Sequence, residues 1–276
     1  MTRQHAISTH SVRRVAKRAA ITIDGAVGSR AGLVVLAYHR VGGHTPSPVD
    51  LPRAIFRRQM AHLAASGDVV TLDEGLRRTN SGLEGELGVV LTFDDGTADF
   101  VDDALPILEE FELPATIYLA TSFIDSGRPF PANGTPLTWA AVRECVSSGL
   151  VTIGAHTHTH SMLDRTDATT IDLELSVSDH RIAEETGVPP RHFAYPKAVA
   201  GSPYADRAVR KRYESAAVAG TRANRAGATD PWRLSRSPIQ NSDGWDGFVR
   251  KRHGGMRTED DLRRLANRLR YRGRMT

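Results

Sequence analysis

The 276-residue sequence has one cysteine, few aromatic residues and no apolar run long enough to span a membrane. The single cysteine, Cys145, excludes an intramolecular disulfide, and its apolar position in an expected helix indicates an inert buried thiol. The apolar stretch at residues 31–38 is far shorter than the roughly 20 residues that a membrane helix needs. Basic residues occur in the first 20 positions, but the apolar segment of a signal peptide does not follow them. We therefore expect a cytoplasmic protein.

The chain also lacks a strong excess of either charge. Its formal net charge is +4, and the pI of about 9.4 reflects arginines that heavily outnumber lysines. Because arginine stays protonated at ordinary pH, it raises the pI without requiring a nucleic-acid partner. Aromatic residues make up 6% of the chain, which disfavours a secreted enzyme that grips long polymers. We expect no binding to nucleic acid.

One domain between two basic ends accounts for the pattern of apolar residues. Short apolar runs alternate with amphipathic stretches, which favours parallel strands joined by helical crossovers. We expect a basic extension at residues 1–30, a central α/β domain at residues 31–255 and a basic helix at residues 256–276. The expected strands of the central domain cover residues 32–38, 69–72, 88–93, 115–120, 151–155, 191–196 and 216–219. One expected helix is marked by Ile55, Met60, Leu63 and Ala64 and closed by Gly67; the others cover residues 101–111, 138–148, 169–186 and 203–213, and the longest loop covers residues 122–136.

The expected C-terminal helix is amphipathic. Leu262, Leu265 and Leu269 share one face, whereas the arginines occupy the rest of the surface. A basic amphipathic helix can bind the surface of an anionic membrane. With only three strong apolar positions, the favoured alternative is a helix that packs on the domain and keeps its basic face in water. Peripheral contact of the basic ends with an anionic membrane stays open.

Two polar clusters stand at the ends of apolar runs. The first, Thr92–Gly96 (TFDDG), follows Gly88–Leu91, and the second, His156–His160 (HTHTH), follows Val151–Ala155. Apolar runs that stop abruptly at carboxylates or imidazoles predict buried strands that carry ligands to a sheet edge or barrel mouth. Two carboxylates and several imidazoles suit a divalent metal ion. Together the clusters predict metal-assisted hydrolysis.

The spacing within the clusters permits a site with three protein ligands. His156 and His160 are separated by three residues, so one helical turn or a tight loop brings both imidazoles to one ion. Asp94 and Asp95 are neighbours at a strand end and point to different sides, so one can bind the ion while the other acts as a base. Spacing alone does not decide between them, and we assign Asp95 as the ligand and Asp94 as the base. Such a site keeps positions open for water and substrate.

The two clusters resemble the first two motifs of the polysaccharide deacetylase (NodB-homology) family of carbohydrate esterases. Three other stretches agree with this resemblance, namely residues 36–41 (LAYHRV), 137–139 (LTW) and 193–196 (FAYP). The resemblance covers about residues 33–250 and implies a distorted (β/α) barrel that removes N- or O-acetyl groups from sugars. It implies that Asp94 is the general base and that Asp95, His156 and His160 bind zinc or a similar divalent ion, such as cobalt or nickel.

Further site residues follow if FAYPK is the third motif of the family. The backbone N–H of Lys197 would then stabilise the oxyanion, although the family commonly has tyrosine there, and Tyr195 becomes a candidate substrate contact. Many family members carry an arginine where this chain has Ala194. Arg236 is therefore our candidate for the charge that orients Asp94.

The resemblance does not extend to the proton donor for the leaving amine. The late Leu-x-His motif that carries this imidazole in the family is missing from the chain. His253 is the candidate substitute, and it lies in a basic, glycine-rich stretch. His39, at the end of the first expected strand, is a second histidine that could line the site. The geometric criterion for a general acid decides between them.

We expect a metal-dependent hydrolase that removes acetyl groups, most of all N-acetyl groups, from a carbohydrate or glycoconjugate. Trp139, Trp232, Trp245 and Tyr195 are available to stack on sugar rings. One alternative is a catalytically impaired member of the family that binds a carbohydrate or a partner, which the missing late histidine favours. The other is a non-haem iron enzyme, whose facial triad also has two histidines and a carboxylate. The spare carboxylate has no role in oxygen chemistry and disfavours that alternative.

Overall fold

A computed structural model describes residues 32–82, 85 and 88–256 of the chain. The expected basic extension at residues 1–30 and nearly all of the expected C-terminal helix lie outside these residues, so both stay predictions. None of the helices in the described ranges is long and apolar enough to cross a bilayer.

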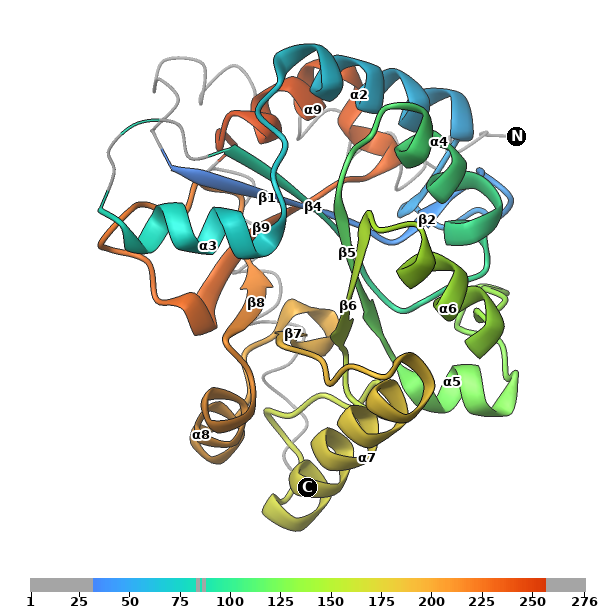
Figure 1. Cartoon of the computed structure of the whole chain (residues 1–276), viewed down its shortest axis with the longest axis vertical. Helices are drawn as coiled ribbons and strands as arrows, with labels where there is room; N and C mark the ends of the chain where they lie inside the picture. Colours follow the sequence, from blue (N-terminus) through green and yellow to red (C-terminus); the bar gives the residue numbers. More distant parts are fainter. Residues whose placement is uncertain (1–31, 83–84, 86–87, 257–276) are drawn as a thin grey trace, which may run out of the picture.

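Seven parallel strands of the described chain close into a barrel (Figure 1). The order is β1-β4-β5-β6-β7-β8-β9, and β9 pairs back onto β1. The strands are β1 (Leu33–Tyr38), β4 (Gly88–Phe93), β5 (Ala115–Leu119), β6 (Val151–Ala155), β7 (His192–Ala194), β8 (Ser215–Ala219) and β9 (Leu234–Pro238). This closure confirms the (β/α) barrel that the sequence predicts.

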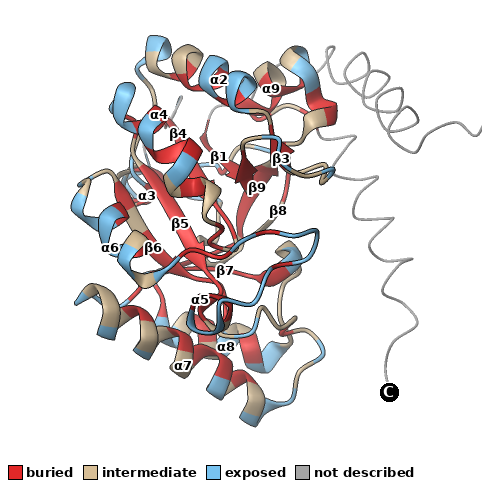
Figure 2. Cartoon of the chain, turned by 90° about the vertical axis from the view of Figure 1, so that its right-hand side faces the viewer, coloured by how far each residue is buried: buried red, intermediate tan, exposed pale blue. Residues whose placement is uncertain are grey.

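Helices surround the barrel, with their buried sides turned toward the strands (Figures 1 and 2). The α-helices are α2 (Arg53–Ser66), α3 (Leu72–Asn80), α4 (Leu105–Glu110), α5 (Thr121–Ser126), α6 (Trp139–Ser147), α7 (Ala168–Thr186), α8 (Pro203–Arg212) and α9 (Gly244–Arg252). Shorter elements are the π-turn η1 (Phe100–Ala104), the 3-10 turns η2 (Pro196–Ala198), η3 (Pro231–Arg233) and η4 (Asn241–Asp243), and the paired strands β2 (Arg40–Val41) and β3 (Asp50–Leu51).

Helix α3 closes one end of the barrel and so leaves the other end for a site. Leu72 and Leu76 of α3 join a buried cluster with side chains of the barrel strands, among them Leu33 and Val90. The close approach of helix and strand requires Gly75, because a Cβ atom there would lie 2.7 Å from Leu33 Cδ1. Since β1 and β4 begin at this end, the carboxyl ends of the strands lie at the opposite end.

Two elements predicted from the sequence, at residues 69–72 and 101–111, differ from the structure. The strand predicted at residues 69–72 is a single bridge between Val69 and Val89, because the Thr71 side chain accepts a hydrogen bond from Glu74 N and starts α3. The helix predicted at residues 101–111 begins instead as the π-turn η1. Pro106, which lacks an N–H, stands in the first turn of the following α4.

The expected loop at residues 122–136 is partly helical and is held in place. Helix α5 occupies its beginning, and the Arg40 guanidinium donates hydrogen bonds to the carbonyl oxygens of Pro131 and Ala132, at 2.6 and 2.9 Å. The amide of Ala98 also donates to the Thr135 carbonyl oxygen. This segment is therefore tied to the residues that follow β4, near the carboxyl ends of the strands.

Candidate active site

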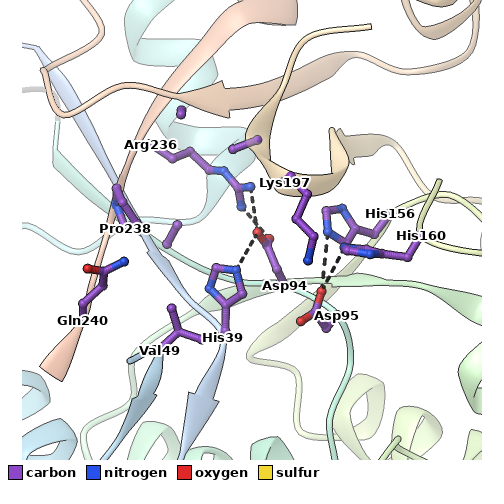
Figure 3. A pocket seen from close by; sticks show the side chains of 13 residues that line it. His39, Val49, Asp94, Asp95, His156, His160, Lys197, Arg236, Pro238 and Gln240 are labelled. Carbon is purple, nitrogen blue, oxygen red and sulfur yellow. Dashed lines mark hydrogen bonds and ion pairs between the residues drawn. The ribbon is translucent and has the colours of Figure 1, made fainter. Parts of the chain in front are cut away.

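A pocket of about 250 Å³ opens at the carboxyl ends of the barrel strands (Figure 3). Both polar clusters of the sequence reach it, from the ends of β4 and β6. Its lining residues are Ala37, His39, Val49, Asp94, Asp95, His156, His160, Lys197, Ala198, Ala219, Arg236, Pro238 and Gln240. Because parallel strands bring their carboxyl ends together, residues about 140 positions apart in the sequence share this pocket.

The end of β4 separates its two carboxylates. The amide of Asp94 donates to the Tyr38 carbonyl oxygen and so continues the pairing of β4 with β1. Asp95 then takes a left-handed conformation with φ 75°, and Gly96 follows with φ 93°. A Cβ atom at Gly96 would lie 2.8 Å from Leu119 Cδ2, so both the backbone and the close contact require glycine. The Asp94 and Asp95 side chains consequently face different neighbours.

Asp94 forms a buried, two-point ion pair with Arg236 of β9. The distances from Arg236 Nη1 and Nη2 to Asp94 Oδ1 and Oδ2 are 2.6 and 2.9 Å, and the side chains are 2% and 5% exposed. Burial raises the pKa of Asp94, but the positive charges of Arg236, His156 and His39 outweigh it and keep the pKa well below its usual range. Asp94 is therefore ionised at neutral pH.

Asp95, His156 and His160 form a group whose ligand atoms all lie within 4.8 Å of one another. Asp95 Oδ1 is 3.7 Å from His156 Nε2 and 3.3 Å from His160 Nε2. A tetrahedral ion with bonds of about 2.0 Å places its ligand atoms about 3.3 Å apart, so these distances suit such an ion. His156 Nδ1 lies 2.6 Å from the Ala194 carbonyl oxygen, which can only accept, so Nε2 is left as the unprotonated ligand nitrogen.

The segment that carries the two histidines is a tight loop rather than a helical turn. Thr157 and His160 both adopt φ 63°, a conformation that costs a residue with a Cβ atom about 1–3 kcal/mol. The side chain of His158 points elsewhere, since its Nδ1 lies 2.8 Å from Thr121 Oγ1. The loop thus presents two of its three histidines to the pocket.

Acid should destabilise the metal-free protein through these histidines. Burial lowers the pKa of His156, and burial together with His156 and Lys197 lowers the pKa of His160 to about 3. In the unfolded chain both titrate near 6.5, so the unfolded state binds protons first as the pH falls. We expect the free energy of unfolding to decrease between pH 6.5 and about 3.

Urea unfolding of the metal-free protein at several pH values tests this expectation. His160→Asn should flatten the pH dependence, whereas His180→Asn, which removes a histidine that is 76% exposed on α7, should leave it unchanged. An equal slope for wild type and His160→Asn would show that His160 does not titrate abnormally.

Two of the remaining predicted site residues lie in the pocket. His39 Nε2 is 3.8 Å from Asp94 Oδ2, and His39 Nδ1 is buried without a hydrogen-bond partner. Lys197 adopts φ 56°, and its side chain extends into the space between Asp94 and the Asp95–His156–His160 group (Figure 3). Their roles in a reaction stay predictions.

Tyr195 and His253 lie away from the pocket. The Tyr195 side chain is fully buried and packs edge-on against Phe193, so it cannot contact a substrate there. His253 follows α9 and contacts Arg252, whose guanidinium pairs with Asp68 at 2.9 Å. Asp68 accepts from the amide at the start of β4, so His253 lies toward the closed end of the barrel. The sequence gives no sign of this, because it does not fix where α9 docks.

No phenylalanine, tyrosine or tryptophan lines the pocket within the described residues, so stacking of these side chains on sugar rings is not supported. Trp139 Nε1 donates to Asp125, and Trp232 Nε1 donates to the Tyr213 carbonyl oxygen. The guanidinium of Arg58 covers the ring of Trp245 at 3.9 Å from its centroid.

Val49, Pro238 and Gln240 line the wall of the pocket and were not anticipated. Pro238 ends β9, a strand that the apolar pattern does not reveal because it alternates serine and arginine. Val49 stands in the glycine- and proline-rich loop after β2, and the Asn241 amide donates to the nearby Pro48 carbonyl oxygen. A loop that follows a strand end was the only available signal for these residues.

Comparison with known proteins identifies the barrel. A family model described as polysaccharide deacetylase matches residues 84–218, which include both polar clusters. This segment of the chain is similar to the polysaccharide deacetylase family. Poly-beta-1,6-N-acetyl-D-glucosamine N-deacetylase of Escherichia coli strain K12 is 30% identical over 142 residues, which cover 46% of this chain. The match spans only 20% of the length of that enzyme.

Solved structures share the fold. IcaB from Ammonifex degensii aligns with a TM-score of 0.66 and 24% identity over 80% of this chain and 97% of that one. The Streptococcus pyogenes deacetylase PplD, solved with acetate, aligns with a TM-score of 0.69 and 22% identity over 80% of this chain and 98% of that one. His39 and Arg236 lie outside the segment that the family model matches, and the barrel alone brings them to the pocket.

Proposed function

We propose that this protein belongs to the polysaccharide deacetylase family and is a metal-dependent hydrolase that removes acetyl groups, most of all N-acetyl groups, from a carbohydrate or glycoconjugate. The observation that carries the proposal is the ligand group Asp95–His156–His160 beside the ionised Asp94 in one open pocket. The acetylated glucosamine polymer in the name of the Escherichia coli relative supports an N-acetylated sugar as the substrate class.

The pocket residues divide the hydrolysis into separate tasks. Bound to Asp95, His156 and His160, a divalent ion, zinc above all, would polarise the acetyl carbonyl and acidify the attacking water. Asp94, ionised beside Arg236, accepts the proton of that water as it attacks. The oxyanion that develops on the carbonyl oxygen requires a hydrogen-bond donor, and the backbone N–H of Lys197 supplies it in this proposal.

The leaving amine also needs a proton when the carbon–nitrogen bond breaks. With the three ligands, Asp94 and its partner Arg236 assigned, His39 and Lys197 are the remaining described pocket residues that can donate one. We assign this step to His39, because its Nε2 stands 3.8 Å from Asp94 and therefore on the side of the pocket where the proton is collected.

Acetate release by metal-stripped protein tests the proposal. We expect N-acetylglucosamine monomers, oligomers or glycoconjugates to release acetate only after Zn²⁺, Co²⁺ or Ni²⁺ is added back, because the proposed reaction needs the ion to acidify the attacking water. An O-acetylated sugar with the same skeleton separates amide from ester cleavage. Tight metal binding without acetate from any substrate would contradict the proposal and favour a binding protein of the same family.

A further inference from the structure

One buried carboxylate outside the pocket is bonded to the loop that carries His160. Glu174 lies on α7, is 6% exposed and faces the residues on both sides of His160. The amide of Thr159 donates to Glu174 Oε2 at 2.8 Å, the Thr159 hydroxyl donates to Oε1, and the Ser161 hydroxyl donates to Oε1 at 3.2 Å. The backbone of Glu174 is engaged too, since its carbonyl oxygen accepts from the amide of His158 at 3.1 Å.

The Glu174 carboxylate forms no salt bridge within the described residues. No arginine, lysine or histidine nitrogen of the described chain lies within 4.0 Å of it, so its partners there are the loop's own hydroxyl and amide groups. Burying a carboxyl group is costly unless its hydrogen bonds are satisfied. Such a residue fits a role in fixing the shape of the loop.

Within the loop, His160 needs such a restraint more than His156 does. His156 directly follows β6 and is oriented by its own contact with the Ala194 carbonyl oxygen. His160 is four residues farther along and adopts φ 63°, which an unrestrained loop would avoid. Residues 159 and 161, which flank it, are the ones whose side chains contact Glu174.

We propose that Glu174 is a positioning residue that fixes His160 in its left-handed conformation and thereby sets the metal affinity of the Asp95–His156–His160 site. The inference rests on the metal site of the proposed function. It does not depend on the acetylated substrate, since metal binding can be measured without one. Glu174 acts through the hydrogen bonds to Thr159 and Ser161 and touches neither metal nor substrate.

The test is the affinity of the full chain for Zn²⁺ and Co²⁺, measured by competition with a chromogenic chelator. Glu174→Ala should weaken binding by about 10- to 100-fold, the usual cost of removing a group that orients a metal ligand. Glu174→Gln should stay within about three-fold, because its oxygen can accept from Thr159 N–H and its amide can donate to the two hydroxyls. Ser178→Ala is the matched control, since this serine is also fully buried on α7 but its hydroxyl has no hydrogen-bond partner.

A spectroscopic measurement and a second variant test the same role of Glu174. The visible spectrum of the Co²⁺ protein should change shape in Glu174→Ala but not in Glu174→Gln or Ser178→Ala, because it reports the ligand arrangement. If Glu174→Ala does not fold, Thr159→Val removes one of the hydroxyls and should weaken metal binding by a smaller factor.

A folded Glu174→Ala or Thr159→Val protein with wild-type affinity and spectrum would overturn the role of Glu174. Wild-type protein that binds no metal would overturn this inference and the proposed function together. Wild-type protein that binds metal but releases no acetate would refute only the function.

Discussion

Replacing Asp94 with asparagine is expected to lower the rate of acetate release by about 10²- to 10⁴-fold, the usual contribution of a general base. Asparagine has nearly the same shape but cannot take a proton from water. Metal affinity should change little, because Asp95 and the two histidines supply the ligand atoms. Steady-state kinetics and chelator competition on the same preparation measure both quantities.

The same substitution should destabilise the fold, because it leaves Arg236 as an uncompensated charge in the barrel. Breaking a buried ion pair by removing one partner typically costs about 3–5 kcal/mol. Activity must therefore be measured where urea unfolding shows the variant to be folded. Asp125→Asn is the matched control, since it removes a carboxylate that pairs with Arg181 at the surface, and it should leave activity within two-fold.

A parallel loss of metal and activity in Asp94→Asn would contradict the assignment. In that case Asp94 would be the ligand and Asp95 the base, the arrangement that sequence spacing alone leaves open.

The barrel was predictable because its strands are buried on both faces. The run Gly88–Leu91 is apolar without alternation, which is typical of parallel strands covered by helices, and Val151–Ala155 contains a single polar residue, Thr152. Strand β9 was not predicted, because it has no continuous apolar run. Its buried residues include Ser235, Arg236 and Ser237. Polar contacts rather than hydrophobicity hold two of them, since the Ser235 amide donates to Asn224 Oδ1 and Arg236 pairs with Asp94.

Side-chain placement was predictable only where a motif fixes it. Asp94, Asp95 and His156 stand within two residues of a strand end, and His160 lies in the loop that continues from β6, so the barrel topology brings them together. His253 is separated from the last strand by a turn and a helix, and nothing local determines on which end of the barrel that helix stops.

Tyr195 and Lys197 show the same limit within a single turn. They are two residues apart, yet the first points into the core and the second into the pocket, because Lys197 adopts a left-handed conformation. The sequence gives no sign of this left-handed conformation, since position 197 is neither glycine nor asparagine. For the same reason the sequence did not decide between a helical turn and the tight loop that presents the two ligand histidines, in which Thr157 and His160 adopt positive φ.

The substitution Arg236→Met is expected to reverse the direction in which the pKa of Asp94 is shifted. It should be the second substitution with a large effect on activity. Without the guanidinium, burial remains the largest influence on Asp94, so its pKa should rise. The acid limb of the pH–rate profile should therefore move upward relative to wild type, and the maximal rate near neutral pH should fall because part of Asp94 is protonated. A pH profile of kcat/KM for both proteins measures this shift.

Stability should respond with the matching sign. In the wild type, the lowered pKa of Asp94 adds stability that is present above the unfolded value of 3.8 and is lost as the pH falls through the folded value. In Arg236→Met, Asp94 releases its proton more readily in the unfolded chain than in the folded one. The loss of stability relative to wild type should therefore be largest near neutral pH, at about 3–5 kcal/mol. The difference from wild type should shrink toward pH 4, where Asp94 becomes protonated in the variant.

The double variant Asp94→Asn/Arg236→Met separates loss of the pair from loss of packing. Removing both charges leaves no unpaired ion in the barrel, so the double variant should be more stable than the sum of the single effects predicts. Unfolding free energies that simply add would show that the two side chains do not depend on each other. An unshifted acid limb in Arg236→Met would lead to the same conclusion from the kinetics, and the ionisation of Asp94 would then need another source than Arg236.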